Sequence, residues 1–209
     1  MKIKTSGLFN TIRNKSIFEG ERNKNPIIFA ACCVVGICVG VVCETLSYDV
    51  YTAISVNFVD YLNEVSGFSF FGVFLNCAAY NSVFFVISML LGLCAVGYIF
   101  IYFVPFAKGL GIGCVCSYIY SAYAIKGFCY CAMLVFPAAL IQMIALIMAC
   151  SESCQMSKDI LHVLEKKESE NTEADTSFYI LRYCVFFAVM LISCVMYAVM
   201  CKVFVNVIN

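Results

Sequence analysis

The sequence predicts an all-α fold, a polytopic membrane helix bundle with about five transmembrane helices, and two observations support that prediction. Hydrophobic residues make up 63% of the 209 residues and charged residues only 12%, whereas soluble domains are about half apolar and about a quarter charged. The apolar residues also stand in long runs without charge, separated by a few polar segments. Too little polar surface is left to cover a water-soluble globule, so a lipid bilayer is the solvent that fits this chain.

The first apolar run follows a basic N-terminal segment, residues 1–25, which carries six Lys or Arg residues against two Glu residues. The run is free of charge from Ile27 to Cys43 and can extend to Leu46, so it predicts a first span over about 27–46. A cleavable signal peptide has a shorter basic flank and a small-residue cleavage site, and neither is found here. We therefore interpret this run as the first helix of a membrane domain over residues 26–204.

The outer segment, residues 44–67, contains acidic residues and no basic one. Because basic residues favour the cytoplasmic side, we expect the N-terminus in the cytoplasm and this segment outside. Helical spacing of its apolar residues indicates a short amphipathic helix on the outer membrane surface. That helix either caps the bundle, which is the plainer interpretation, or docks a partner protein. Its apolar face consists of Val50, Ile54, Phe58, Tyr61 and Leu62.

Residues 65–107 carry no charge at all, which is more than one span needs and barely enough for two. Asn76, Asn81 and Ser82 interrupt the first part of this stretch. We expect a re-entrant or interfacial piece at about 67–79, with a long tilted helix as the alternative, and a second helix over about 81–103.

Pro105 and Lys108 predict a tight cytoplasmic turn, followed by a third helix over about 106–123. Lys126 and Gly127 predict an outer turn within 121–127, followed by a fourth helix over about 128–150.

The last long polar segment, residues 151–182, holds four basic and seven acidic residues. Basic residues decide orientation and acidic ones contribute little, so we expect this loop in the cytoplasm. Its first half extends the fourth helix, and its second half, over 168–177, has the composition of a disordered acidic linker. A fifth helix over about 183–203 then places the C-terminus outside.

The chain contains fifteen cysteines, and nearly all lie inside the apolar runs. A disulfide framework would lie in polar loops, so we interpret the cysteines as small packing residues of membrane helices. Cys114 and Cys116 are two residues apart, and so are Cys129 and Cys131. Such pairs point roughly 200° apart on a helix and cannot share one tetrahedral ion. We expect no metal site and no cofactor.

No catalytic constellation is apparent in the sequence. His162 is the only histidine and lies in the polar loop, where it cannot serve a nucleophile in the membrane. Asp60 and Glu64 are one helical turn apart, which is ordinary for a solvated helix face. The net charge is zero, and no basic stripe indicates nucleic acid. We therefore expect a protein that is not an enzyme and does not bind nucleic acid.

The glycines and the few polar residues within the apolar runs indicate how the helices contact each other. Gly109 and Gly113 in one run match the small-xxx-small spacing that lets membrane helices approach closely, as do the glycines at 36 and 40 in another. We expect Lys108 at the inner interface, where its ammonium can reach water. Asn81 and Gln142 are the most polar groups deep in their spans, and interhelical hydrogen bonding is their expected role.

The joint spacing of these residues resembles that of a known family. Its elements are an asparagine followed by two glycines, a lysine-glycine pair with a further glycine, and a lysine-glycine pair with a later proline. In this chain the residues are Asn81, Gly92, Gly97, Lys108, Gly109, Gly113, Lys126, Gly127 and Pro137. Over about residues 27–204 the chain resembles the stage II sporulation protein M family of bacterial membrane proteins. Many of those relatives carry a glutamate where this chain has Gln142.

The resemblance implies a role in endospore formation, in which the mother-cell membrane engulfs the forespore. Family members are thought to anchor the stage II sporulation proteins P and D, which degrade peptidoglycan, at the sporulation septum. By this resemblance the chain is a scaffold in the bacterial cell membrane, with membrane lipids and those hydrolases as partners and a homo-oligomer left open.

The alternative is a permease-like subunit that moves a small or lipidic solute through the bundle. A transporter more often shows repeated broken helices and charged residues in its spans. The sequence favours the scaffold because its expected spans hold no acidic residue and no basic one except Lys108.

Overall fold

The computed structural model describes residues 4–46, 70–130, 136–166 and 172–208, and these residues are helical except at two short breaks. Five of its segments are long and apolar enough to cross a membrane. The all-α prediction and the number of spans are therefore confirmed. The spans are Asn25–Leu46, Phe70–Leu93, Gly97–Ser121, Phe136–Leu161 and Phe178–Cys201.

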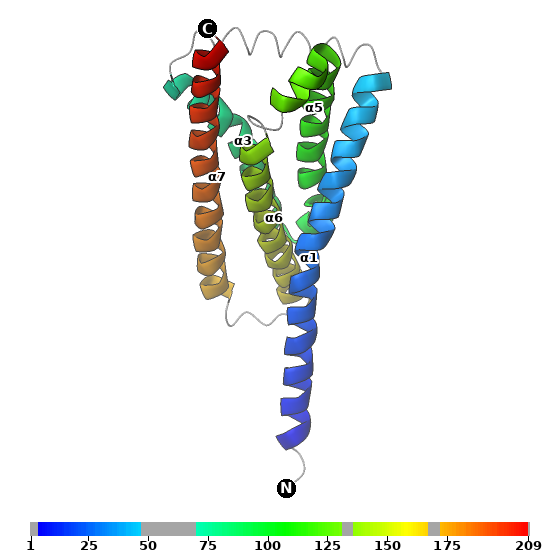
Figure 1. The fold of residues 1–209 in the computed structure, drawn as a ribbon. Coiled ribbons are helices and arrows are strands. Elements are labelled where there is room, and N and C mark those ends of the chain that lie inside the picture. The colour runs from blue at the N-terminus through cyan, green and yellow to red at the C-terminus, as the bar shows by residue number, and fades with distance from the viewer. Residues whose placement is uncertain (1–3, 47–69, 131–135, 167–171, 209) are drawn as a thin grey trace.

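The helices form one bundle in which sequence neighbours run in opposite directions, apart from the short α4 (Figure 1). The N-terminal part of α1 extends beyond the bundle at one end, and the chain terminates at the other. The central helix is α6, which contacts α1, α3, α4, α5 and α7. The bounds are Lys4–Leu46 for α1, Phe70–Leu93 for α3, Gly97–Phe100 for α4, Phe103–Tyr130 for α5, Phe136–Lys166 for α6 and Thr172–Ile208 for α7.

Helices α1 and α5 run side by side in the same direction, with their backbones in contact (Figure 1). A Cβ atom added to Gly40 would lie 2.3 Å from the carbonyl oxygen of Leu110, and one added to Gly113 would lie 2.3 Å from that of Ile37. Gly36 and Gly109 meet carbonyl oxygens of the opposite helix in the same way. The close approach that the glycine spacing predicts is present, and it brings Cα–H groups against carbonyl oxygens, where weak hydrogen bonds form.

The other half of the bundle is packed by aromatic rings and thiols from α3, α6 and α7. Phe85 of α3 meets the rings of Tyr183 and Phe187 of α7 edge-on, each at a centroid separation of 6.0 Å. Cys150 and Cys154 of α6 are fully buried in this core. Within the described residues the cysteines that can be assessed form no disulfide, in agreement with their interpretation as packing residues.

The turn between the second and third spans lies at residues 94–96 and not at Pro105 and Lys108, as the sequence led us to expect. Ser157 of α6 fixes it, because its hydroxyl donates to the Cys94 carbonyl at 2.6 Å and accepts from the Tyr98 amide at 2.9 Å. A Cβ on Gly97 would lie 1.8 Å from the Leu91 carbonyl oxygen, so the turn requires glycine there. Pro105 is in the first turn of α5, where its missing N–H costs no hydrogen bond.

Residues 70–79 belong to the continuous helix α3, so the long-helix alternative is correct for them and the re-entrant one is wrong. The polar side chains that seemed to interrupt the stretch bond back to their own helix. Ser82 donates to the Ala78 carbonyl at 2.6 Å, and Asn81 donates to the Cys77 carbonyl at 2.8 Å. Such bonds satisfy the side chains without breaking the helix.

Three further boundaries differ from those expected. Lys126 and Gly127 lie inside α5 and not in a turn, and the expected fourth helix begins at Phe136. The part of the acidic stretch from Thr172 onward is the start of α7 and not a disordered linker. Hydrophobicity located the spans, but apolar length alone does not fix where a helix ends. Residues 47–69, which contain the predicted outer amphipathic helix, are outside the described residues.

The glycine contact between α1 and α5 predicts unequal effects of two alanine substitutions on the same helix. Gly113→Ala places a methyl group against the Ile37 carbonyl and should lower the free energy of unfolding by about 1–3 kcal/mol. Gly111→Ala is the matched control, because its Cβ would meet only the Tyr80 hydroxyl at 3.4 Å. Thermal unfolding in detergent measures both, and equal midpoints for the two variants would contradict the close contact.

Candidate functional site

Lys108 lies inside the bundle and not at the membrane interface, which corrects the expectation drawn from the sequence. Its side chain is 5% exposed, and its ammonium donates to the Asn81 side-chain oxygen at 2.6 Å. Asn81 lies midway along α3 and is 4% exposed. A charged group at this depth is costly unless the protein supplies its partners, so the contact from α5 to α3 is a feature that the bundle must accommodate.

Two aromatic rings of α3 complete the surroundings of the ammonium. Nζ of Lys108 is 4.7 Å from the ring centre of Tyr80 and 5.2 Å from that of Phe84. Tyr80 and Phe84 are one helical turn apart and contact each other edge-on. The faces of such rings attract a cation, and the attraction increases where water is excluded.

The lysine also fixes the orientation of the Asn81 amide. An ammonium can only donate, so the amide oxygen must face Lys108 and the amide nitrogen must face away from it. That nitrogen reaches the Cys77 sulfur at 3.5 Å and the Cys194 sulfur at 3.9 Å. The asparagine therefore connects a cation on one side with two sulfur atoms on the other.

Gln142 of α6 reaches the same two sulfur atoms. Its side-chain nitrogen lies 3.7 Å from the sulfur of Cys77 and 3.8 Å from that of Cys194. The two thiols thus share both amide nitrogens as neighbours. Side chains from α3, α5, α6 and α7 thus meet at one point. We call this set the buried polar cluster, and it consists of Cys77, Asn81, Lys108, Gln142 and Cys194.

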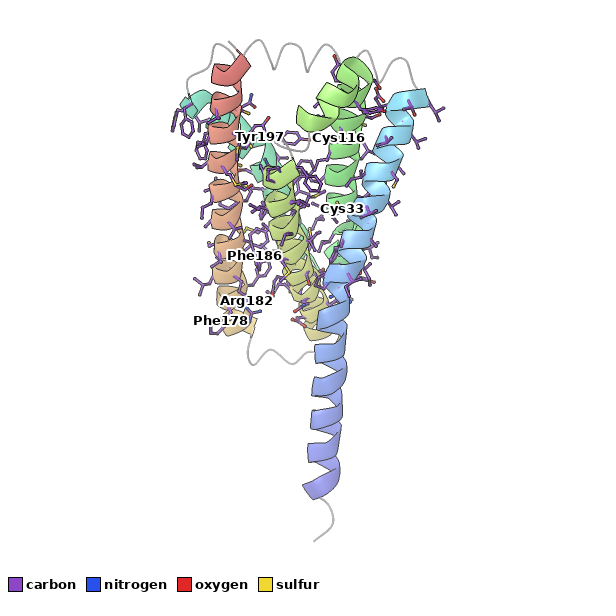
Figure 2. The ribbon with its side chains drawn as sticks, viewed as in Figure 1. Cys33, Cys116, Phe178, Arg182, Phe186 and Tyr197 are labelled. Carbon is purple, nitrogen blue, oxygen red and sulfur yellow. The ribbon has the colours of Figure 1, made fainter. Side chains whose placement is uncertain are left out.

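No carboxylate pairs with Lys108 among the residues that the structure describes. The ion pair found there joins Arg182 to Glu152 at 3.0 Å, near the end of α7 that Figure 2 labels with Arg182 and Phe178. The contacts of the ammonium are the Asn81 oxygen and the rings of Tyr80 and Phe84. An amide oxygen and two aromatic rings therefore take the place of a counter-ion.

Cys33 lies on the part of α1 that belongs to the bundle (Figure 2) and links α1 to α6. Its thiol donates to the Met143 sulfur at 3.5 Å. Its carbonyl oxygen faces Gly109, the residue after Lys108. The glycine contact and the buried polar cluster are thus parts of one packed region.

Glu44 lies within the first span, so the expectation that no span holds an acidic residue is wrong. Its side chain is 3% exposed and accepts a hydrogen bond from Ser117 of α5 at 2.5 Å. Glu44 directly follows Cys43, the last residue of the charge-free run. Helix α5 packs parallel to α1 at this position and covers the Glu44 side chain. This carboxylate and Lys108 are separate features, each held by a neutral partner.

A second polar network joins α3, α6 and α7 on the side of the bundle where α7 begins. Tyr183 bonds to Ser88 and to the Phe85 carbonyl, and Tyr179 bonds to Ser153 at 3.0 Å. A Cβ on Gly92 would lie 2.5 Å from the Tyr179 hydroxyl, so this glycine makes room for the tyrosine.

The structure thus brings together Asn81, Lys108 and Gln142, which the sequence singled out separately. Gly109 and Gly113 face α1, Gly92 and Gly97 lie beside the turn at 94–96, and Pro137 is in the first turn of α6. Sequence reasoning missed Cys77 and Cys194 as part of the site. The position of Cys77 one turn before Asn81 was the available signal, while nothing local pointed to Cys194.

The remaining predicted site residues lie outside the described side chains. The side chains of Lys126, Gly127 and His162 are not among those described, and Val50, Ile54, Phe58, Tyr61 and Leu62 lie in residues 47–69. Within the described part of the chain, no group of three or more His, Cys, Asp or Glu residues is arranged to hold a metal ion.

Five spans, a glycine-packed helix pair and a polar cluster shared by four helices define a multi-pass membrane protein. The profile of stage II sporulation protein M matches residues 27–202, which include nearly all of the five spans. The chain belongs to the stage II sporulation protein M family, as its residue spacing predicted, and is a sporulation-related membrane protein. No curated protein and no solved structure matches it.

The contact between Lys108 and Asn81 predicts strong coupling of two substitutions. Asn81→Leu leaves the buried ammonium without its acceptor and should cost about 3–5 kcal/mol of stability. Lys108→Met in the same chain removes the charge and should restore most of that loss. Thermal unfolding of both single variants and the double variant measures the coupling.

Ser82→Ala is the control for this pair, because Ser82 is adjacent to Asn81 and bonds only to its own helix in the contacts described. It should change stability by less than about 1 kcal/mol. Additive effects of Asn81→Leu and Lys108→Met would show that the two side chains do not depend on each other.

Proposed function

We propose that the chain is a membrane scaffold for endospore formation that anchors peptidoglycan hydrolases at the septum during forespore engulfment. The observation that carries the proposal is the extent of the family match, which runs through the membrane helices from residue 27 to residue 202. The partners proposed are the stage II sporulation proteins P and D, by the resemblance set out above. In this proposal the wall chemistry belongs to the hydrolases, and the chain itself is not an enzyme.

The packing of the bundle supports a role that needs a fixed shape. The backbones of α1 and α5 are in contact at four glycines, which leaves little freedom for one helix to shift along the other. Among the described side chains, no buried nitrogen or oxygen atom lacks a hydrogen-bond partner. Fully satisfied polar networks favour one arrangement over its alternatives, and an anchor must present its outer surface in a constant geometry.

The proposed orientation has the N-terminus in the cytoplasm and the C-terminus outside. The basic residues of segment 1–25 and the acidic residues of segment 44–67 support it. The opposite positions of the two chain ends in Figure 1 are compatible with it. In this orientation the outer segment faces the wall side, and Val50, Ile54, Phe58, Tyr61 and Leu62 form the proposed docking surface for the hydrolases.

Co-purification from sporulating cells tests the docking surface. Replacing residues 48–65 by a polar linker of equal length should abolish recovery of both hydrolases while the protein still enters the membrane. An equal treatment of residues 167–171, on the proposed cytoplasmic side, should leave recovery unchanged. Protease protection of tags at the two termini reports whether both variants keep the orientation. Unchanged hydrolase recovery from a correctly inserted 48–65 variant would show that the docking surface is elsewhere.

A permease-like subunit is the second candidate, and the buried charges favour it. Lys108 and Glu44 are both covered within spans, and membrane proteins often keep such residues for transport. The sequence argued against a transporter because its expected spans hold no acidic residue, and the buried Glu44 removes that argument.

Reconstituted vesicles separate the two candidates. If the chain moves a solute, flux should be present with the unaltered protein and should fall by at least about tenfold in Lys108→Met or Gln142→Ala. Ser82→Ala is the control and should retain full flux. The scaffold proposal predicts no flux with any of these proteins, so a flux that depends on Lys108 would contradict it as a complete account.

A further inference from the structure

Three sulfur atoms lie together at the buried polar cluster. Cys194 and Met190 are one turn apart on α7, and the Cys194 thiol is 3.6 Å from the Met190 sulfur. Cys77 of α3 shares the amide nitrogens of Asn81 and Gln142 with Cys194 as neighbours. Cys194 and Met190 are fully buried, and Cys77 is partly buried. Two helices thus supply two thiols and one thioether to the region around these two amides.

Two side-chain amides direct their donor nitrogens at the two thiols. The amide nitrogens of Asn81 and Gln142 each lie within 3.9 Å of both thiol sulfurs. The Asn81 nitrogen has to face the sulfurs because Lys108 holds its oxygen. Hydrogen-bond donors that point at sulfur stabilise the thiolate form, which a cysteine adopts when a metal ion displaces the thiol proton.

We propose that Cys77, Cys194 and Met190 bind a soft monovalent metal ion, copper(I), inside the buried polar cluster. Thiolate and thioether ligands select copper(I) among the first-row metals. Two thiolates carry two negative charges, and copper(I) and the Lys108 ammonium carry one positive charge each, so the assembled site is neutral. A zinc ion would leave one net positive charge in a region of low dielectric and would lack a fourth ligand.

The spacing of the Cys194 and Met190 sulfur atoms fits a three-coordinate ion. Metal–thiolate bonds are about 2.3 Å long, so sulfurs that share one trigonal ion lie about 4 Å apart. The separation of 3.6 Å between Cys194 and Met190 is close to that value. The cluster contains only two cysteines, which is why a search for three or more His, Cys, Asp or Glu ligands does not reveal it.

Binding is a ligand exchange without electron transfer. Each of the two thiols loses its proton to water, and each sulfur–hydrogen bond is replaced by a sulfur–copper bond. The thioether of Met190 adds its lone pair without losing a group. The metal enters and remains as copper(I). Release of the two protons leaves one negative charge on each cysteine sulfur.

Competition with a chromophoric copper(I) chelator tests the site in the full-length protein, purified in detergent under reducing, oxygen-free conditions. One equivalent of copper(I) should resist the chelator in the unaltered protein. Cys77→Ser and Cys194→Ser should each lose that equivalent. Lys108→Met keeps all three ligands and should weaken binding by about 10–100-fold, because it removes only the compensating charge.

The matched control is the double variant Cys150→Ser with Cys154→Ser, which removes two fully buried thiols one turn apart on α6. It should keep the tight equivalent. If the control loses copper as readily as Cys77→Ser and Cys194→Ser do, or if those two variants retain it, the proposal is overturned and the metal is bound adventitiously by thiols.

X-ray absorption keeps the proposal testable if a serine variant fails to fold. Copper(I) in the unaltered protein should show three sulfur neighbours at about 2.3 Å and no nitrogen or oxygen. Met190→Leu should reduce the sulfur neighbours to two. A first shell with nitrogen or oxygen, or no change in Met190→Leu, would exclude this ligand set.

Discussion

The ammonium of Lys108 is the constraint on which the rest of this bundle depends. Placed in the third span, it cannot reach water, and the neighbouring helices must supply what water would have given. Asn81 provides the acceptor, and Tyr80 and Phe84 provide the ring faces. Once the Asn81 oxygen is committed to the lysine, its nitrogen is directed at Cys77 and Cys194, and Gln142 meets the same sulfurs from α6. One charge thereby sets the register of four helices.

The two halves of the bundle are held together differently, and the lysine connects them. Helices α1 and α5 meet backbone to backbone at glycines, while α3, α6 and α7 meet through rings, hydroxyls and thiols. Direct contact between α3 and α5 is sparse. The Lys108 side chain crosses the space between α3 and α5. The next residue, Gly109, packs against the Cys33 carbonyl of α1, and the Cys33 thiol donates to the Met143 sulfur of α6. Small residues bring α5 against α1, and the long side chain next to them reaches to α3.

Hydrophobic length predicted five spans correctly, because that signal is summed over about twenty residues and tolerates local error. The predicted boundaries are wrong where a single polar residue suggests a surface. Lys108 and Pro105 suggest a turn, although proline is permitted in the first turn of a helix and lysine can find partners inside a bundle. Asn81 and Ser82 suggest an interruption, although both bond to their own helix. The cluster itself could not be derived, because Cys194 enters it only through the packing of α7 on α3.

Gln142 decides how the charge of Lys108 is balanced. A glutamate at this position would offer the lysine a buried counter-ion and would repel any thiolate nearby. An amide does the reverse: its nitrogen donates to the sulfurs of Cys77 and Cys194 and leaves the lysine without a carboxylate partner in the described contacts. A neutral donor at 142 is therefore compatible with the thiols at 77 and 194. The negative charge that a carboxylate would supply can arise here only on sulfur, which is also the atom that a soft cation binds.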